Sequence, residues 1–297
     1  MTDVSERSSL AGDPKLVGDW FFEVEKSGYA QGLRVRKRLT TQQTAFQKLE
    51  IVDTDAWGKV LVLDDALQTS EFDEFMYHEM LVHVAMMTHP NPRRVLIIGG
   101  GDGGALRRVL EYPNVEPVQV EIDAAVIDSC KTHMPSISAG AYDNPRAQVV
   151  VGDGIAYMKE NQDAFDVIIV DSTDPVGPAV QLFEVPFYSD VFRSLTSDGL
   201  LIAQSSSPIF MRDDLKHQAA NMRRVFPIVR TYLGVVTGYP GALWSYTIGS
   251  KQHDPAIVDP AGIEQRLAQN SVPTRYYSPA VHRAAFVLPP FVAEILA

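Results

Sequence analysis

The sequence predicts an α/β protein in which a small antiparallel β-sheet precedes a mostly parallel sheet covered by helices. Three observations lead to this prediction. Short strand-like segments follow one another near the N-terminus, strands and helices alternate after residue 90, and a glycine-rich turn connects the first apolar strand to a helix. Alternation of this kind is typical of parallel sheets, because a parallel connection must cross over the sheet.

The N-terminal region has the short period of β-strands. Residues 33–39 partly alternate between apolar and polar side chains, and residues 46–52 and 59–63 are two further strand-like runs. Residues 53–58 separate the last two runs and have the composition of a turn. We therefore expect a small antiparallel sheet, and we assign residues 1–76 to an N-terminal β-domain.

The first helix is predicted over residues 72–88 and ends at Asn91 and Pro92. Its apolar residues recur at helical spacing and form one broad face. They are Phe75, Met76, Met80, Val84 and Met87.

The second domain, residues 77–297, continues with alternating elements. Strands are expected at residues 95–98, 117–122, 147–151, 165–170, 200–203, 229–236 and 243–248, and helices at 105–111, 124–133, 190–195 and 212–226. In a parallel sheet, ligands bind outside the carboxyl ends of the strands. Residues 252–297 contain Pro289-Pro290 and a Ser278-Pro279 pair, from which we expect irregular but packed structure.

Composition and charge narrow the function classes. The 297 residues are 45% hydrophobic with a net charge of −11, and no apolar run reaches the length of a membrane span. We expect a cytoplasmic protein that binds neither nucleic acid nor membrane, because phosphates require a basic surface. An acidic cleft would instead concentrate a cationic ligand. Cys130 lies in an apolar helical pattern that favours core packing, and the seven histidines show no metal-ligand spacing, so we expect no metal site.

The glycine-rich turn, residues 99–104, matches G-x-G-x-x-G directly after a strand and before a helix. That context indicates a nucleotide or nucleoside site, because glycines allow the backbone to approach a ligand closely. Asp102 inside the turn disfavours a pyrophosphate, which its carboxylate would repel, and suits a sulfonium compound or an amine.

Two further strand ends complete a predicted nucleoside pocket. Glu121 ends the second strand of the domain, 20 residues after Gly101, where an acidic residue accepts hydrogen bonds from ribose hydroxyls. Asp153 and Gly154 follow the third strand and could contact an adenine ring. Ribose binding without phosphate binding indicates a cofactor of the S-adenosylmethionine type.

Carboxylates also follow the next strand. Asp171 and Asp174 emerge at its end, and Pro175 favours an extended conformation of Asp174. Two acids at this place can bind a diamine and accept a proton from it. An alkylamine has a pKa of about 10.4 and must lose a proton before its nitrogen can attack carbon.

Several motifs, in the right order, resemble the spermidine synthase family. They are Tyr77-His78-Glu79-Met80, the segments 68–75 and 97–104, and the segment 171–178. The resemblance implies an N-terminal β-domain, a Rossmann-like methyltransferase-type domain and a homodimer or homotetramer. It implies a polyamine aminopropyltransferase that moves the aminopropyl group of decarboxylated S-adenosylmethionine, a co-substrate rather than a cofactor, to putrescine, giving spermidine and methylthioadenosine.

The resemblance also implies roles for individual residues. Asp171 would accept the proton and Asp102 would hold the amino end of the aminopropyl group. The methylthioadenosine part would be held by Gln47, Glu121, Asp153, Gly154 and Pro178. The polyamine side would be formed by His78, Asp174, Tyr77, Tyr239 and Trp20. This chain departs from many relatives at Gln204-Ser205-Ser206, where they carry Gln-x-Glu, which alters the far end of the amine pocket.

Three other functions remain open from the residues. A diamine N-methyltransferase would use S-adenosylmethionine itself and share most of these motifs, although Asp102 favours a donor with a free amine. A nicotinamide-dependent oxidoreductase would place the pyrophosphate of its cofactor beside Asp102, and the carboxylate of Asp102 disfavours this. A non-catalytic polyamine-binding protein would not need the set Tyr77, Asp102, Asp171 and Asp174.

Overall fold

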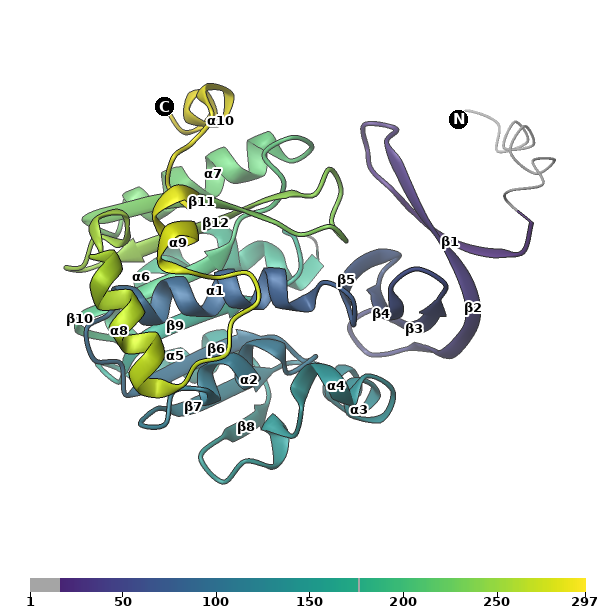
Figure 1. Cartoon of the computed structure of the whole chain (residues 1–297), viewed down its shortest axis with the longest axis horizontal. Coiled ribbons are helices and arrows are strands. Elements are labelled where there is room, and N and C mark those ends of the chain that lie inside the picture. The colour runs from purple at the N-terminus through teal and green to yellow at the C-terminus, as the bar shows by residue number, and fades with distance from the viewer. Residues whose placement is uncertain (1–16, 176) are drawn as a thin grey trace.

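The computed structural model describes residues 17–175 and 177–297, without the side chains of residues 177 and 178. It has two β-sheets, as Figure 1 shows: a smaller one near the N-terminus and a larger one flanked by helices. Within these ranges none of the helices combines the length and apolar character needed to cross a bilayer.

The smaller sheet is an antiparallel meander of five strands in chain order. Its strands are β1 Asp19–Val24, β2 Ala30–Gln43, β3 Lys48–Thr54, β4 Gly58–Leu63 and β5 Ala66–Ser70. Alternate side chains of neighbouring strands, among them Phe21, Val35 and Val52, pack into one apolar cluster. This period of two is what a half-buried antiparallel sheet requires. The small antiparallel sheet expected from the sequence is confirmed.

The larger sheet has seven strands in the order β11-β12-β10-β9-β6-β7-β8. Its strands are β6 Arg94–Gly99, β7 Glu116–Glu121, β8 Gln148–Val151, β9 Phe165–Asp171, β10 Leu195–Gln204, β11 Ile228–Val235 and β12 Leu243–Ser250. The five strands from β10 to β8 are parallel; at one edge β12 pairs antiparallel with β10, and β11 pairs antiparallel with β12. The chain runs from β6 outward to β8 and then returns to β9 on the other side of β6. This reversal makes the carboxyl ends of β6 and β9 the switch point at which such sheets bind ligands.

Helices cover both faces of the larger sheet. The helices of the described residues are α1 Glu74–Thr88, α2 Gly104–Leu110, α3 Ala124–His133, α4 Pro135–Ser138, α5 Gly154–Glu160, α6 Val185–Ser194, α7 Arg212–Arg223, α8 Pro260–Asn270, α9 Pro279–Ala285 and α10 Pro290–Leu296, with short 3-10 turns at Ala141–Asp143, Gly177–Phe183 and Pro255–Ile257. Of these, α3 and α4 pack against the smaller sheet, and α10 packs on α7. One face packs against α1, α2, α8 and α9, and the other against α5, α6 and α7. Neighbouring residues of β6 alternate between the two cores: Val95 and Ile97 face the first, and Leu96 and Ile98 the second.

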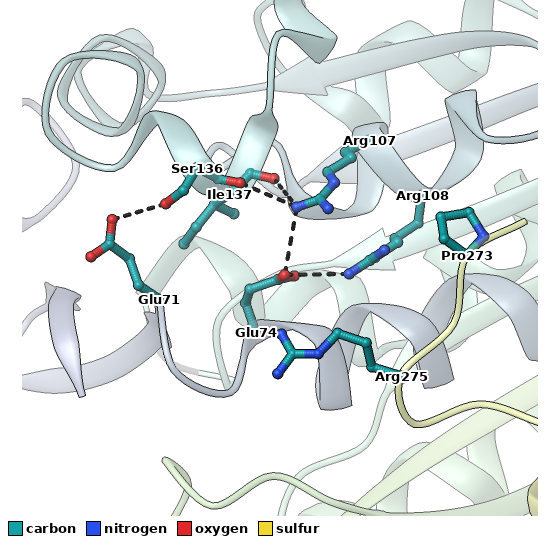
Figure 2. Close-up of a pocket in the computed structure, with 8 residues that line it drawn as sticks. All are labelled: Glu71, Glu74, Arg107, Arg108, Ser136, Ile137, Pro273 and Arg275. Carbon is teal, nitrogen blue, oxygen red and sulfur yellow. Dashed lines mark hydrogen bonds and ion pairs between the residues drawn. The ribbon is translucent and has the colours of Figure 1, made fainter. Parts of the chain in front are cut away.

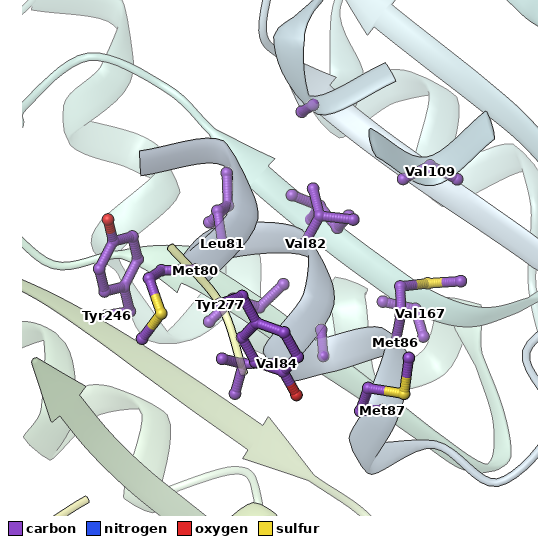
Figure 3. Packing of buried hydrophobic residues seen from close by; sticks show 14 of the residues in the cluster. Met80, Leu81, Val82, Val84, Met86, Met87, Val109, Val167, Tyr246 and Tyr277 are labelled. Atoms are coloured by element: carbon purple, nitrogen blue, oxygen red, sulfur yellow. The ribbon is translucent and has the colours of Figure 1, made fainter. Parts of the chain in front are cut away.

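Helix α1 is buried almost all round, which differs from the single apolar face expected for it. Figure 3 shows its methionine, valine and leucine side chains packed among the sheet and the C-terminal segment. Its polar residues Glu74, His78, Glu79 and His83 are also buried, and each has a polar partner. Buried polar groups need such partners because an unpaired one costs free energy. Helix α1 therefore positions charged side chains inside the molecule.

The C-terminal region corrects one expectation. Residues 252–297 were expected to be irregular, but they contain α8, α9 and α10. Proline occupies the first position of each of these helices, at Pro260, Pro279 and Pro290. Proline is compatible with a first helical turn, since its missing N–H would have no partner there. Of the prolines that indicated irregular structure, Pro279 and Pro290 begin helices and Pro289 directly precedes one.

The predicted boundary between residues 76 and 77 lies within α1, which begins at Glu74. Helix α6 is longer than expected, since it spans Val185–Ser194 rather than residues 190–195. Helix α5 was not expected. Asp153 caps it by accepting a hydrogen bond from the N–H of Ile155, a role that short acidic side chains often take.

Candidate active site

The glycine-rich turn lies beside the end of β9. Gly99 pairs with Asp171 in the parallel register of β6 and β9, and the N–H of Gly100 donates to the carbonyl oxygen of Asp171 at 2.8 Å. Gly100 has a φ of +68°, and a Cβ atom there would lie 2.8 Å from Oδ2 of Asp171. Only glycine combines this backbone conformation with this close approach. The turn therefore brings the backbone of one predicted motif against the carboxylate of another.

Asp171 is held by a tyrosine from α1. The hydroxyl of Tyr77 donates a hydrogen bond of 2.7 Å to Oδ1 of Asp171. Oδ2 is buried and has no hydrogen-bond partner among the described residues. Burial raises the pKa of Asp171 to about 6, the charge of Asp102 adds to this, and His78 and Tyr77 oppose it. A carboxylate with one occupied and one free oxygen and a pKa near neutrality suits proton transfer.

Asp102 is paired with a histidine from α1. Its Oδ1 accepts the N–H of Gly104 at 2.7 Å and lies 3.4 Å from Nε2 of His78. Nδ1 of His78 lies 2.9 Å from Oε2 of Glu74. Burial by itself lowers the pKa of His78, but the charge of Asp102 and the contacts with Glu74 outweigh it and raise the pKa to about 10. The ring is therefore an imidazolium at neutral pH and offsets part of the negative charge that gathers here.

The position of His78 differs from the expected one. Its side chain is fully buried, and its ring lies directly against Gly104, where a Cβ atom would overlap it. The ring is thus behind Asp102, and it does not line the cavity described next. Its Nε2 lies 3.4 Å from Oδ1 of Asp102, and its ring meets the ring of Tyr77, which lines the cavity, edge to face with centroids 5.2 Å apart.

A narrow cavity of about 30 Å³ lies beside these acids. The predicted residues Tyr77, Asp174 and Tyr239 line it, together with Glu23 and Trp244, which sequence reasoning missed. The hydroxyl of Tyr239 donates to the carbonyl oxygen of Gln68, and the rings of Tyr77 and Tyr239 meet edge to face with centroids 5.6 Å apart. Aromatic walls with acidic groups suit a linear cation with apolar methylene groups.

The segment Gln204-Ser205-Ser206 supports Asp174. The Ser206 hydroxyl donates to Oδ1 of Asp174 at 2.9 Å, and Gln204 Nε2 lies 3.4 Å from the same oxygen. Burial raises the pKa of Asp174, and these two bonds oppose the shift. A hydroxyl donor therefore occupies the place at which the family resemblance implied an acid.

Glu23 brings a carboxylate to the same cavity from β1. Its side chain is buried on the same face of the strand as Phe21 and accepts a hydrogen bond of 2.8 Å from Gln31. Burial raises the pKa of Glu23 to about 7, and the bond from Gln31 opposes it. An acidic residue on the apolar face of an alternating strand was the signal in the sequence that could have identified it.

The predicted nucleoside-binding residues lie along the neighbouring strand ends. Glu121 Oε1 accepts the N–H of Asp123, and Asp123 Oδ2 accepts hydrogen bonds from Gln47 and Thr44. A Cβ atom on Gly101 would lie 3.0 Å from Oε2 of Glu121, so this carboxylate borders the glycine-rich turn. Burial raises the pKa of Glu121 to about 7. Gln47, from the smaller sheet, and Glu121, from the larger one, are thus joined through Asp123, which sequence reasoning did not include.

Four predicted residues lie at the margins of the site or outside the described contacts. Asp153 and Gly154 follow β8, and the N–H of Gly152 next to them donates to the carbonyl oxygen of Glu121. Trp20 lies in β1, stacks on Phe22 and does not line the cavity. The backbone of Pro178 lies in the 3-10 turn Gly177–Phe183, and its side chain is outside the described part of the structure.

A larger cavity of about 250 Å³ lies on the other side of Glu74, and its lining carries three arginines. Figure 2 shows Arg107 and Arg108 pointing toward Oε1 of Glu74, at 3.7 and 3.3 Å. Glu74 also binds His78, so these arginines support the carboxylate that holds the imidazolium. This cavity does not contain Asp102, Asp171 or Asp174.

Known proteins resemble this chain over most of its length. The family model described as "Spermine/spermidine synthase domain" matches residues 74–258, and the one described as "Spermidine synthase tetramerisation domain" matches residues 19–71. A polyamine aminopropyltransferase from Desulforudis audaxviator is 48% identical over 93% of this chain and 98% of its own length, and one from Moorella thermoacetica is 46% identical over 94% and 96%.

Solved structures are similar over the same extent. A crystal structure of spermidine synthase in complex with the transition-state analogue AdoDATO has a TM-score of 0.89 at 39% identity, and it covers 94% of both chains. The spermidine synthase from Thermotoga maritima has a TM-score of 0.88 at 39% identity and the same coverage. The α/β fold with a Rossmann-like domain and an N-terminal β-sheet is therefore confirmed. The chain belongs to the spermine/spermidine synthase family of polyamine aminopropyltransferases.

Proposed function

We propose that this chain transfers the aminopropyl group of decarboxylated S-adenosylmethionine to putrescine, giving spermidine and methylthioadenosine. The observation that carries the proposal is the gathering of Asp102, Asp171 and Asp174 around the carboxyl ends of β6 and β9, with Tyr77 bonded to Asp171. The donor carries a sulfonium and an ammonium, and the acceptor is a diamine. Buried carboxylates are complementary to all of these charges.

The donor would lie along the strand ends from β6 to β8. Glu121, bordering the glycine-rich turn, would accept hydrogen bonds from the ribose, and Asp102 would bind the ammonium of the aminopropyl group. The imidazolium of His78 supports this role of Asp102, since it lies 3.4 Å from Oδ1 and orients that carboxylate. The remaining contacts to the methylthioadenosine part are assigned to Gln47, Asp153, Gly154 and Pro178.

The acceptor would lie in the narrow cavity between Tyr77 and Tyr239. Asp174 would bind it near the reacting end, and Glu23 offers a carboxylate from β1 for the distant ammonium. Glu23 thereby supplies the negative charge that the Gln204-Ser205-Ser206 segment lacks. Trp20 would approach the far end of the amine only after a rearrangement of β1, since it does not line the cavity here.

The reaction is an in-line displacement. The amine nitrogen forms a bond to the aminopropyl carbon next to sulfur, the carbon–sulfur bond breaks, and its electron pair leaves on sulfur as a neutral thioether. The proton of the amine passes to the free Oδ2 of Asp171, while Tyr77 fixes the orientation of that carboxylate through Oδ1. The positive sulfur already activates the carbon, so the reaction needs no resident cofactor. Orientation in the narrow cavity supplies a further part of the rate.

The assembly would be a homodimer or a homotetramer formed through the smaller sheet. Residues 19–71 match a tetramerisation domain, and the strand β1 exposes Phe22 and Val24 at 45% and 62% of their surface. Exposed apolar side chains on one edge strand favour contact with another chain. Sedimentation of the purified protein would give the number of chains.

The purified chain should be incubated with decarboxylated S-adenosylmethionine and, separately, putrescine, cadaverine, diaminopropane or spermidine. Mass spectrometry should detect methylthioadenosine and an aminopropylated amine, with putrescine as the best acceptor. A parallel series with S-adenosylmethionine tests methyl transfer. A methylated amine in that series, without product in the first, would replace the proposal by a methyltransferase; another preferred amine would change only the acceptor.

A further inference from the structure

A second group of polar side chains gathers at the opposite edge of the larger sheet from the acids described above. His89 directly follows α1, Asp198 lies near the start of β10, and His253 lies three residues after the end of β12. Asp171 and Gln204, in contrast, are at the carboxyl ends of β9 and β10. The group therefore lies at the amino edge of the parallel strands and takes no part in the proposed transfer.

The three side chains converge on a single point. Nε2 of His89 and Nε2 of His253 each lie 3.5 Å from the same oxygen, Oδ2 of Asp198. One ligand-type atom from each of the three residues lies within 4.8 Å of the others. Both Nε2 atoms are buried and have no hydrogen-bond partner within the part of the chain that the structure describes. Buried nitrogen atoms usually have a partner, so this pair requires an explanation.

The distances fit a shared metal ion better than a pair of hydrogen bonds. An N–H···O bond is about 2.7–3.2 Å long, so 3.5 Å exceeds that range for both histidines. A tetrahedral ion with bonds of about 2.0–2.1 Å separates its ligand atoms by roughly 3.3–3.4 Å. The Asp198 oxygen and each histidine nitrogen are therefore already close to the spacing of two ligands on one zinc ion.

The backbone holds each ligand at the end of a regular element. The N–H of His89 donates to the carbonyl oxygen of Ala85, and the N–H of His253 donates to the hydroxyl of Ser250. Asp198 lies within β10, and the next residue, Gly199, accepts a hydrogen bond from the N–H of Lys251. The segments that carry Asp198 and His253 are thus tied to each other. Ligands mounted on such elements need little reorganisation to bind an ion.

We propose that His89, Asp198 and His253 bind one divalent transition-metal ion of the Zn²⁺ type. Two imidazoles and one carboxylate favour such an ion over Mg²⁺ or Ca²⁺, which prefer oxygen ligands. The His89 side chain is buried, whereas those of Asp198 and His253 are 36% and 29% exposed, so the ion has an entry path and a water molecule can take the fourth position. The ion would tie together the end of α1, the start of β10 and the segment after β12.

Metal binding changes one hydrogen bond. The N–H of Asn91 donates to Nδ1 of His89 at 3.2 Å, so in the neutral metal-free ring the proton is on Nε2. An ion at Nε2 displaces that proton, and the ring then carries its proton on Nδ1. The bond from Asn91 therefore opens when the metal binds, and Asn91 lies between two prolines in the short connection from α1 to β6. Metal uptake exchanges one neutral hydrogen bond for a metal–nitrogen bond.

Co²⁺ provides a direct test, because its visible absorption reports tetrahedral coordination. The full-length protein, stripped of metal with a chelator, should bind one Co²⁺ per chain with intense visible bands, and Zn²⁺ should displace it. Asp198→Asn and His253→Ala, at partly exposed positions, should each weaken binding more than about 100-fold, since even partners outside the ligand shell contribute 10–100-fold. His217→Ala is the matched control. His217, on α7, also lies beside a carboxylate, with its Nε2 3.0 Å from Oε1 of Glu184, but it is not one of the three proposed ligands.

Thermal unfolding gives a second readout that separates metal binding from a purely structural role of these side chains. Zn²⁺ should raise the unfolding temperature of the wild type and of His217→Ala, because it binds only the folded chain. It should leave the unfolding temperatures of Asp198→Asn and His253→Ala unchanged. The proposal is overturned if the wild type binds no tetrahedral Co²⁺. It is also overturned if Asp198→Asn and His253→Ala bind Co²⁺ as tightly as the wild type does.

Discussion

The hydroxyl of Tyr77 lies 2.7 Å from Oδ1 of Asp171, although the two residues are 94 positions apart in the chain. Tyr77 comes from the buried helix α1, and Asp171 comes from the end of the buried strand β9. Two rigid elements therefore fix the carboxylate and leave its second oxygen free. Positioning a proton acceptor from packed elements is more precise than positioning it from loops.

Replacing Asp171 by asparagine should lower kcat by about 10²–10⁴-fold, the usual contribution of a positioned acid or base. Binding of the nucleoside product methylthioadenosine should change little, because Glu121 and its partners are untouched. Single-turnover rates and calorimetry with methylthioadenosine would measure the two effects.

Asp128→Asn is the control for that substitution, since it makes the same chemical change at an exposed position of α3. If Asp171→Asn keeps the wild-type turnover, Asp171 is not the proton acceptor. If Asp171→Asn also loses methylthioadenosine binding, Asp171 stabilises the structure of the site rather than accepting the proton.

The acid limb of the pH profile should depend on Tyr77. Burial raises the pKa of Asp171 to about 6, and the hydrogen bond from Tyr77 lowers it by favouring the ionised form. The proton acceptor must be ionised, so kcat/KM should fall as the pH drops below about 6. In Tyr77→Phe the lowering contribution is lost, and the midpoint should move to higher pH by roughly 0.5–1 unit, which corresponds to about 1 kcal/mol.

Profiles of kcat/KM for the wild type and Tyr77→Phe would be compared under the same conditions, so that the titration of the amine itself cancels. Tyr157→Phe, in α5 on the other face of the sheet, serves as the control. A midpoint that stays in place or moves to lower pH in Tyr77→Phe would show that Asp171 does not govern this limb.

Glu23 should determine how the far end of the acceptor is held. Glu23→Gln keeps the size of the side chain and removes the charge, so KM for putrescine should rise by roughly 10–100-fold, equivalent to about 1.5–3 kcal/mol for a charged hydrogen bond. The KM of decarboxylated S-adenosylmethionine should remain within about twofold, because Glu23 is distant from the proposed donor site at the ends of β6, β7 and β8. Steady-state kinetics with both substrates would show the difference.

Glu264→Gln, exposed on α8, is the matched control for this change. An unchanged KM for putrescine in Glu23→Gln would remove Glu23 from the acceptor site. The double variant Glu23→Gln/Ser206→Glu should recover part of the lost affinity, since it restores one carboxylate to the region of Asp174.

Glu79 should stabilise the whole fold rather than the chemistry. Its carboxylate is fully buried and accepts hydrogen bonds from the consecutive N–H groups of Arg275, Tyr276 and Tyr277, at 2.8–3.0 Å. Glu79→Gln replaces a charged acceptor by a neutral amide, and we expect the free energy of unfolding to fall by about 2–4 kcal/mol. Urea unfolding would measure it, with Glu264→Gln expected within about 0.5 kcal/mol of the wild type.

A loss of less than about 1 kcal/mol in Glu79→Gln would mean that other contacts attach the C-terminal segment to α1. Among these, Arg266 donates hydrogen bonds to the carbonyl oxygens of Met86 and Met87. The combination with Arg266→Lys would then test whether this second attachment is sufficient.

Local patterns predicted the parts of this protein that depend on neighbouring residues. The glycine-rich turn, the acids at strand ends and the alternation of strands and helices each arise from a few consecutive residues, whose sterics and burial the sequence shows directly. Helix α1 was located for the same reason. Its burial on all sides was not foreseen, because Glu74, His78 and Glu79 look like a solvent face until their partners are known.

The C-terminal helices were missed because prolines were interpreted as signs of irregular structure, although proline is also common at the first position of a helix. Pro279 and Pro290 were taken as signs of irregular structure, yet each begins a helix, as Pro260 also does. Asp259 and Ser278 are suitable N-caps that the sequence displays.

By itself, the sequence determined the family, the α/β class, and the presence of acids at the carboxyl ends of β6, β7 and β9. The tertiary structure decided which distant side chains meet. It turned His78 behind Asp102, brought Glu23 from β1 into the cavity, and gathered His89, Asp198 and His253 at the opposite edge. His89 and His253, for example, are 164 positions apart, and no local spacing encodes such contacts. The register of the sheet and the packing of α1 against it set these distances, because each strand end is fixed only when its neighbours are in place.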